Sequence, residues 1–76
     1  MIPHDALINA LRQLDFHHKG QADRTLLYKQ KGTTKRVHIR RISLHDEKAA
    51  RILLQQAGMP PDDIENFIAT YRCSQH

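Results

Sequence analysis

Apolar and polar residues alternate along this chain with two different periods, and the change of period predicts its elements. Residues 5–14 carry apolar side chains at helical intervals, and Pro3 suits the start of the first turn. The following apolar residues have the two-residue period of strands, in segments at residues 16–20, 24–29 and 36–40. A turn around Gly32 separates the last two segments. The buried face of the first helix is expected at Leu7, Ile8, Leu11 and Leu14.

The second half of the chain predicts two more helices. Ser43 stands three residues ahead of the carboxylate of Asp46, a spacing typical of a helix start, and this helix is expected to end near residue 57. Gly58 suits the left-handed conformation that closes many helices. A short last helix is expected to follow Pro60 and Pro61. The buried faces of the two helices are expected at Ala50, Leu53, Leu54 and Ala57, and at Ile64, Phe67, Ile68 and Tyr71.

This order of elements predicts an α+β fold, with a three-stranded antiparallel sheet and helices on one of its faces. The 76 residues leave room for one small domain, residues 1–76, and little room for a second core. The apolar runs are too short for a transmembrane helix, and the start of the chain lacks the pattern of a signal peptide. The single cysteine, Cys73, excludes an intramolecular disulfide and a cysteine-rich zinc site. These features favour a cytoplasmic protein without membrane contact.

The net charge of +4 is unevenly distributed along the chain. Between Phe16 and His45 there are eight basic residues and one acidic residue, a local charge of +7, whereas the flanks together carry −3. A concentrated positive charge of this kind is expected on a phosphate-binding surface. The alternative is a solvated sheet edge that lysines protect from pairing with other chains. An edge without such protection could also pair with a second copy of the chain, so a homodimer stays open.

Strand alternation predicts which side chains share the face of the sheet that the helices leave open. A one-residue slip of any strand would change this set, so the prediction depends on the register. Imidazole, hydroxyl and cationic groups together on one exposed surface could bind phosphates, and an imidazole could transfer protons in RNA cleavage. The side chains expected on the open face are His17, Thr25, Leu27, Lys29, Arg36, His38 and Arg40.

The six histidines do not have the spacing of a metal site. His17 and His18 are adjacent on a strand and therefore face opposite ways, and no His-x-x-x-His spacing supports them. The histidines are expected to be surface residues with near-normal pKa values. Cys73 has no obvious orienting base, and no glycine-rich phosphate loop is present. We therefore expect no metal and no cofactor.

Three phrases of the chain resemble the HicA-type (YcfA-like) toxin family. Residues 52–59, Ile-Leu-Leu-Gln-Gln-Ala-Gly-Met, resemble the end of the family's second helix. Residues 11–16, Leu-Arg-Gln-Leu-Asp-Phe, resemble its Leu-x-x-Leu-Gly-Phe phrase, and residues 36–39 resemble its third strand. The resemblance implies a double-stranded-RNA-binding-like α-β-β-β-α fold with a short extra helix. It also implies a messenger-RNA-cleaving toxin that a partner antitoxin, HicB, neutralises.

The catalytic histidine of that family does not carry over to this chain. The family's Gly-Ser-His-x-x-Tyr/Phe phrase falls on residues 23–28, where Thr25 occupies the histidine position and Tyr28 matches the last position. Threonine cannot act as a general base near neutral pH. Three functions therefore stay open: an RNA-binding protein without catalysis, an endoribonuclease that uses His17 or His38, and a module that binds only a protein. The expected RNA-binding residues are Arg24, Thr25, Lys29, Arg36, His38, Arg40 and Arg41.

Overall fold

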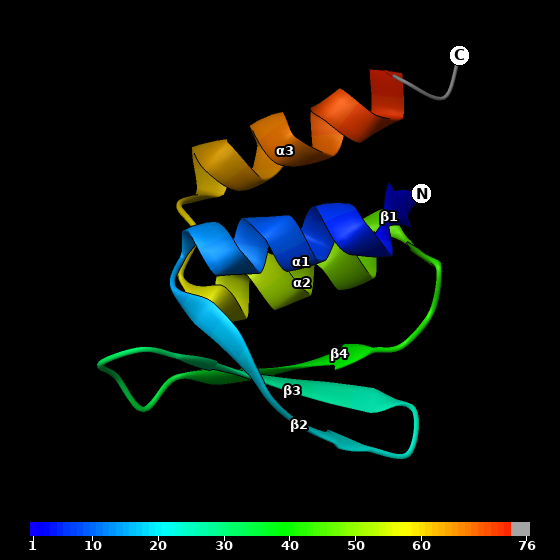
Figure 1. Cartoon of the computed structure of the whole chain (residues 1–76). Coiled ribbons are helices and arrows are strands. Elements are labelled where there is room, and N and C mark those ends of the chain that lie inside the picture. Colours follow the sequence, from blue (N-terminus) through cyan, green and yellow to red (C-terminus); the bar gives the residue numbers. More distant parts are fainter. Residues whose placement is uncertain (74–76) are drawn as a thin grey trace.

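A computed structural model describes residues 1–73 of the chain (Figure 1). The predicted order of a helix, three strands and two helices is confirmed, and two short strands are added to it. The second strand segment begins and ends one residue later than expected, and the first extends two residues further. The elements are β1 (Ile2–Pro3), α1 (His4–Gln13), β2 (Phe16–Ala22), β3 (Thr25–Gln30), β4 (Arg36–Arg40), β5 (Leu44–His45), α2 (Glu47–Ala57) and α3 (Pro61–Cys73).

Three strands form an antiparallel meander in the order β2-β3-β4, and the helices all lie on one side of it (Figure 1). Helix α1 packs against β2 and α2 packs against β4, so these two helices cover one face of the sheet. Helix α3 lies on the far side of this pair, in contact with α2 and β1 (Figure 1). The α+β class with helices on one face is therefore confirmed, and the described part of the chain has three layers.

The core lies between the sheet and the two helices that cover it. Alternate residues of the strands are buried there, and α2 contributes the four residues expected from its periodicity. Of the residues expected on the first helix, Leu14 follows the end of α1 and is only half-buried, and Ala10 is buried in addition. The sheet side chains in this core are Phe16, Leu26, Tyr28, Val37 and Ile39, and the α2 side chains are Ala50, Leu53, Leu54 and Ala57.

The start of α2 differs from the expectation built on Ser43. Asp46 is the N-cap, and its Oδ1 accepts a hydrogen bond of 2.6 Å from the backbone N–H of Ala49. The backbone carbonyl of Ser43 instead accepts a 2.9 Å hydrogen bond from the N–H of His4. The prediction of Ser43 as the helix start is therefore wrong, because the segment before Asp46 is used for strand pairing. The end of α2 is as expected, with Gly58 in the left-handed region at φ 90°.

Strands β1 and β5 form a second, two-stranded antiparallel sheet that no periodicity indicated. Ile2 pairs with His45 and Pro3 pairs with Leu44, which joins the start of α1 to the segment before α2. Ile2 is almost completely buried as a result. Two-residue strands are too short to show alternation, so only the folded structure, which brings residues 2–3 beside residues 44–45, reveals them.

Helix α3 has 13 residues and is the longest helix of the described chain, so the expectation of a short extra helix is wrong. Its apolar stripe is partly confirmed. Ile64 and Ile68 are buried, whereas Phe67 and Tyr71 are half-buried, with their ring centroids 5.0 Å apart. The apolar stripe extends over two turns, from Ile64 to Tyr71, and this explains why α3 is longer than expected.

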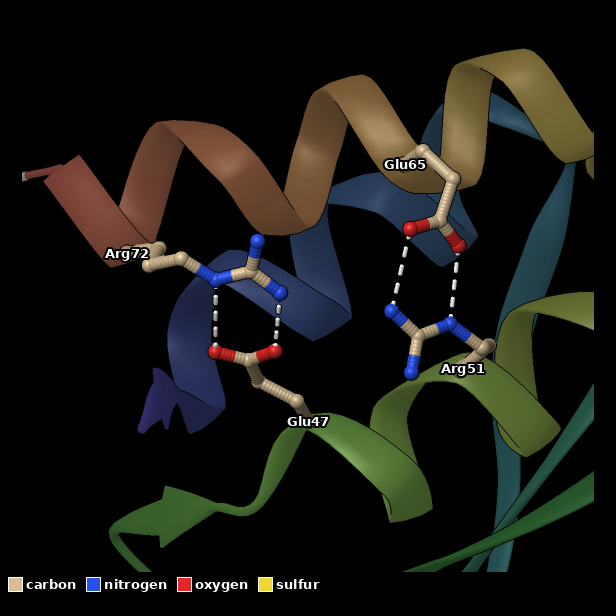
Figure 2. A network of polar contacts seen from close by, with 4 residues as sticks. All are labelled: Glu47, Arg51, Glu65 and Arg72. Atoms are coloured by element: carbon tan, nitrogen blue, oxygen red, sulfur yellow. Dashed lines mark hydrogen bonds and ion pairs between the residues drawn. The ribbon is translucent and has the colours of Figure 1, made fainter.

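Two ion pairs join the exposed sides of α2 and α3 (Figure 2). Arg51 donates two hydrogen bonds to Glu65, at 2.8 and 3.0 Å, and Arg72 donates two to Glu47. These hydrogen bonds lower the pKa of both glutamates. Exposed ion pairs contribute little to stability because water and salt screen them. The attachment of α3 therefore depends mainly on the burial of its two isoleucines.

Replacing Ile68 by alanine tests this account of α3. Ile68→Ala removes a side chain with no exposed surface and is expected to lower the free energy of unfolding by roughly 2–5 kcal/mol. Ile52→Ala is the matched control, because Ile52 is 46% exposed on α2 and its loss should change stability by about 0.5 kcal/mol or less. Urea titration of both variants measures the difference. Equal stability of the two variants would show that α3 does not belong to the core.

Candidate nucleic-acid interface

The register of the sheet determines which side chains lie on the face opposite the helices. His17, Lys29 and Arg36 form one row across the three strands. Leu27 and His38 form the next row with Gly20, and Thr25 and Arg40 form the last row with Ala22. These are the side chains expected on the open face. In the same register, the buried residues of the strands face the helices. Strand alternation therefore predicts both the residues of the open face and the residues of the core.

The open face has positive charge at both ends and an apolar residue between them. The first and last rows are four residues apart along β3, which is about 13 Å. Lys29, Arg36 and Arg40 are exposed, whereas Leu27 and Thr25 are partly buried. Within residues 1–73, no acidic side chain belongs to these rows. A surface with this charge attracts phosphate groups to both of its ends.

Arg24 and Arg41 lie beside the last row of the open face. Arg24 is in the turn between β2 and β3, and its carbonyl accepts a 2.8 Å hydrogen bond from the backbone N–H of Arg41. Both side chains are exposed. The structure therefore groups Arg24, Arg41 and Arg40 at one end of the sheet, and Lys29 and Arg36 at the other. The expected RNA-binding residues lie on or beside one face but form two clusters.

The two histidines of the open face stand at different distances from Thr25. His38 is a diagonal neighbour of Thr25, since it lies two residues before the partner Arg40, and such neighbours are roughly 7–8 Å apart. His17 lies in the first row, on the other side of β3 and about 13 Å along the strand from Thr25. His38 and Arg40 also line a small pocket of about 150 Å³ between β4 and α2. Of the two histidines on the open face, His38 is therefore the nearer to Thr25.

A pair of histidines away from this face was missed by sequence reasoning. His45 is buried and stacks on His4, with ring centroids 5.3 Å apart and a 3.1 Å hydrogen bond between His4 Nδ1 and His45 Nε2. The expectation that all histidines are surface residues with near-normal pKa is therefore wrong for His45. Burial lowers the pKa of His45, and positive charge on His4 and Arg40 lowers it further, whereas Asp46 opposes them.

No signal in the sequence identifies this pair, because the two histidines are 41 positions apart and meet only through the pairing of β1 with β5. Among the described residues, no group of three or more histidine, cysteine or acidic side chains could hold a metal ion. No helix in that part of the chain is long and apolar enough to cross a membrane. The side chain of Cys73, for which the sequence indicates no orienting base, lies outside the described part of the chain.

Comparison with known proteins adds no relative to this description. No protein-family model, no curated protein and no solved structure matches the chain.

The buried His45 predicts a loss of stability in mild acid. The unfolded chain binds a proton at the ordinary histidine pKa of about 6.5, whereas the folded chain does so only at a lower pH. Folding therefore opposes protonation, and the stabilisation present above about pH 6.5 is lost as pH falls towards the lowered pKa. Urea midpoints at pH 7.5 and pH 5.5 measure this loss.

His45→Gln keeps a hydrogen-bonding group beside His4 and removes the titration, so its stability should fall less between the two pH values. His18→Gln is the control, because His18 is exposed on β2, and it should behave like the wild type. An unchanged pH dependence in His45→Gln would show that His45 does not couple folding to protonation.

Proposed function

We propose that this chain is a small basic RNA-binding protein of HicA type, which binds RNA on the open face of its sheet and does not cleave it. The observation that carries the proposal is the arrangement of Lys29, Arg36 and Arg40 on one exposed face without acidic neighbours in its rows. The phrases that resemble the HicA family support RNA as the ligand.

The composition of the face favours contact with the RNA backbone over recognition of bases. The aromatic side chains of the sheet, Phe16 and Tyr28, are buried on the opposite face, so they cannot stack on bases as aromatic platforms do. The two charged ends suit phosphates of one strand, and Leu27 between them suits a sugar or the edge of a base. RNA is then recognised through its backbone and shape, with little sequence preference.

The residue in the family's catalytic position supports binding without cleavage. Thr25 lies on the open face beside Arg40, and its hydroxyl can donate a hydrogen bond to a phosphate oxygen. It cannot accept a proton from a ribose hydroxyl near neutral pH, because a threonine hydroxyl is a very weak base. The loss of an imidazole here removes the general base and leaves the phosphate-binding surface intact.

Replacing three cations of the open face tests the proposed interface. Lys29→Ala/Arg36→Ala/Arg40→Ala should abolish binding of labelled single- and double-stranded RNA in a gel-shift assay. For wild type, neutralising about four phosphates predicts a slope of roughly −3 for log K against log salt concentration. Each of the three single variants should still bind and should reduce the size of this slope by roughly 0.7–0.9, the contribution of one phosphate contact.

The control variant has the same change of charge away from the face. Arg12→Ala/Lys48→Ala/Gln56→Glu alters three exposed positions on α1 and α2 and should keep most of the binding. Equal loss in both variants would mean that net charge, and not the open face, determines binding. If wild type binds neither RNA at low salt, the proposal is wrong and a protein partner such as an antitoxin becomes the better hypothesis.

An endoribonuclease is the second candidate, and the position of His38 favours it. His38 is the diagonal neighbour of Thr25 and lies on the same strand as Arg40, so it could act as a general base on RNA held by the open face. His17 is too far along the sheet to act at the Thr25 position.

Cleavage of labelled RNA by the histidine variants tests this second candidate. If the protein is a nuclease, His38→Ala should reduce the cleavage rate by about 100-fold or more, while His17→Ala should have a smaller effect. His18→Ala is the control, because His18 pairs with Tyr28 and lies on the other face. Cleavage that persists in His38→Ala would exclude His38 as the base, and intact RNA with wild type would exclude the nuclease.

A further inference from the structure

A pocket of about 390 Å³ lies at the end of the open face, beside the turn that connects β3 to β4. Its lining includes His17 and Lys19 from β2, Lys29 from β3, and Lys31, Gly32 and Thr33 from the turn. Lys19 and Lys31 were not among the residues that the sequence pattern placed on the open face. The pocket therefore extends the candidate interface to new residues.

The strand period explains how β2 presents His17 and Lys19 to one pocket, because residues two apart lie on the same face of a strand. His17 lies directly opposite Lys29 in the register. The pairing of β2 with β3 then shifts between His18 and Gly20, so Lys19 has no partner residue on β3. The alternation along β2 and the pair of His17 with Lys29 together bring three side chains from two strands to the same pocket.

The turn beside the pocket is held in place by its own hydrogen bonds. The Oγ1 of Thr33 donates to Gln30 Oε1 at 2.9 Å and accepts from the backbone N–H of Lys35 at 3.1 Å. The Nε2 of Gln30 donates to the carbonyl of Leu14 at 2.9 Å, which ties the turn to the end of α1. Gly32 takes φ 81°, a conformation that favours glycine. A turn fixed in this way loses little freedom when it binds a ligand.

The positive charge of the pocket is not compensated by the protein. Within residues 1–73, the ion pairs join α2 to α3, and none involves a lysine of this pocket. The backbone N–H of Gly32 also makes no hydrogen bond in the described chain. Asp15 is close, since its carbonyl accepts a 2.9 Å hydrogen bond from the N–H of Lys31, but its side chain does not line the pocket. Three lysines line this pocket and take part in none of the ion pairs of residues 1–73, which indicates an anion site.

The amount of charge indicates which anion fits. A phosphodiester within an RNA strand carries one negative charge, and the exposed rows of the open face can hold several of these. A terminal phosphomonoester carries roughly −1.5 to −2 near neutral pH and has three oxygens that accept hydrogen bonds. Lysines bind such groups as point charges from several directions. The grouping of three lysines and an imidazole around one pocket suits the monoester better than the diester.

We propose that the pocket bounded by His17, Lys19, Lys29 and Lys31 binds the terminal phosphate of an RNA strand whose backbone lies along the open face. This inference rests on the proposed function for the identity of the strand, but the anion site itself does not depend on it. The terminal phosphate can belong to the 5′ end or to the 3′ end, because the two have the same chemistry. Its binding fixes where on the face the strand begins.

Three versions of one short single-stranded RNA test the proposal, with a 5′-phosphate, a 3′-phosphate or hydroxyl groups at both ends. One phosphorylated version should bind wild type about tenfold or more tightly than the hydroxyl version, as expected for charge-assisted hydrogen bonds to one added group. The version that gains affinity identifies the end. In Lys19→Gln/Lys31→Gln, the gain should fall to about twofold or less.

The control Lys35→Gln/Lys48→Gln removes the same charge and should keep the gain. Lys35 lies in the same hairpin, but its Nζ is next to Gly58 at the end of α2 and not in the pocket. A gain that both double variants lose equally would overturn the pocket as the site. Equal affinity of wild type for all three RNAs would overturn the proposal while leaving RNA binding by the open face intact.

Inorganic phosphate alone separates this inference from the proposed function. In amide-resolved NMR spectra, added phosphate should shift the signals of Gly32 and Thr33 in wild type but not in Lys19→Gln/Lys31→Gln. This shift without any RNA binding would support the anion site and overturn RNA as its ligand. No shift and no effect of the terminal phosphate would show that these lysines only keep the β2 edge and the turn soluble.

Discussion

The burial of one face of a three-stranded sheet is the constraint on which the rest of this molecule depends. Leu26, Tyr28, Val37 and Ile39 must face α1 and α2, because they supply most of the apolar surface that the sheet contributes to the core. Since side chains of a strand alternate between the two faces, the residues between these four must lie on the opposite, open face. Lys29, Arg36 and Arg40, together with His17 and His38, are thereby collected on the open face.

The candidate site and the core are therefore two results of the same register. A slip of β4 by one residue would expose Val37 and Ile39 and bury Arg36, His38 and Arg40, at a cost that so small a domain could not bear. Core burial thus holds the charged side chains in register without any ion pair among them. Core packing alone is thus enough to position the side chains of this surface. Two features depart from regular strand alternation: the bulge at Lys19 and the turn at Gly32, which its own hydrogen bonds hold in place.

The parts of the fold that were predicted correctly are those with local, repeated signals. Three helices, three strands, the buried faces of the strands and of α2, and the cap at Gly58 follow from residues close together in the sequence. The prediction that Ser43 starts α2 is wrong because Ser43 and Asp46 are both suitable N-cap residues. The carboxylate of Asp46 caps α2, whereas the backbone carbonyl of Ser43 accepts a hydrogen bond from His4 at the start of α1. The pairing of β1 with β5 and the burial of His45 have no local signal, because their partners are some 40 residues away.

The sequence by itself determined the class of fold, most of the core and the set of residues on the open face, since strand and helix periods are local properties of the chain. Only the tertiary structure decided how those residues are grouped. It separates Lys29 and Arg36 from Arg40 and Arg41, places His38 and not His17 beside Thr25, and brings Lys19 and Lys31 to one pocket. The physical reason is that register, bulges and turn geometry depend on contacts between strands, which a period along one strand does not contain.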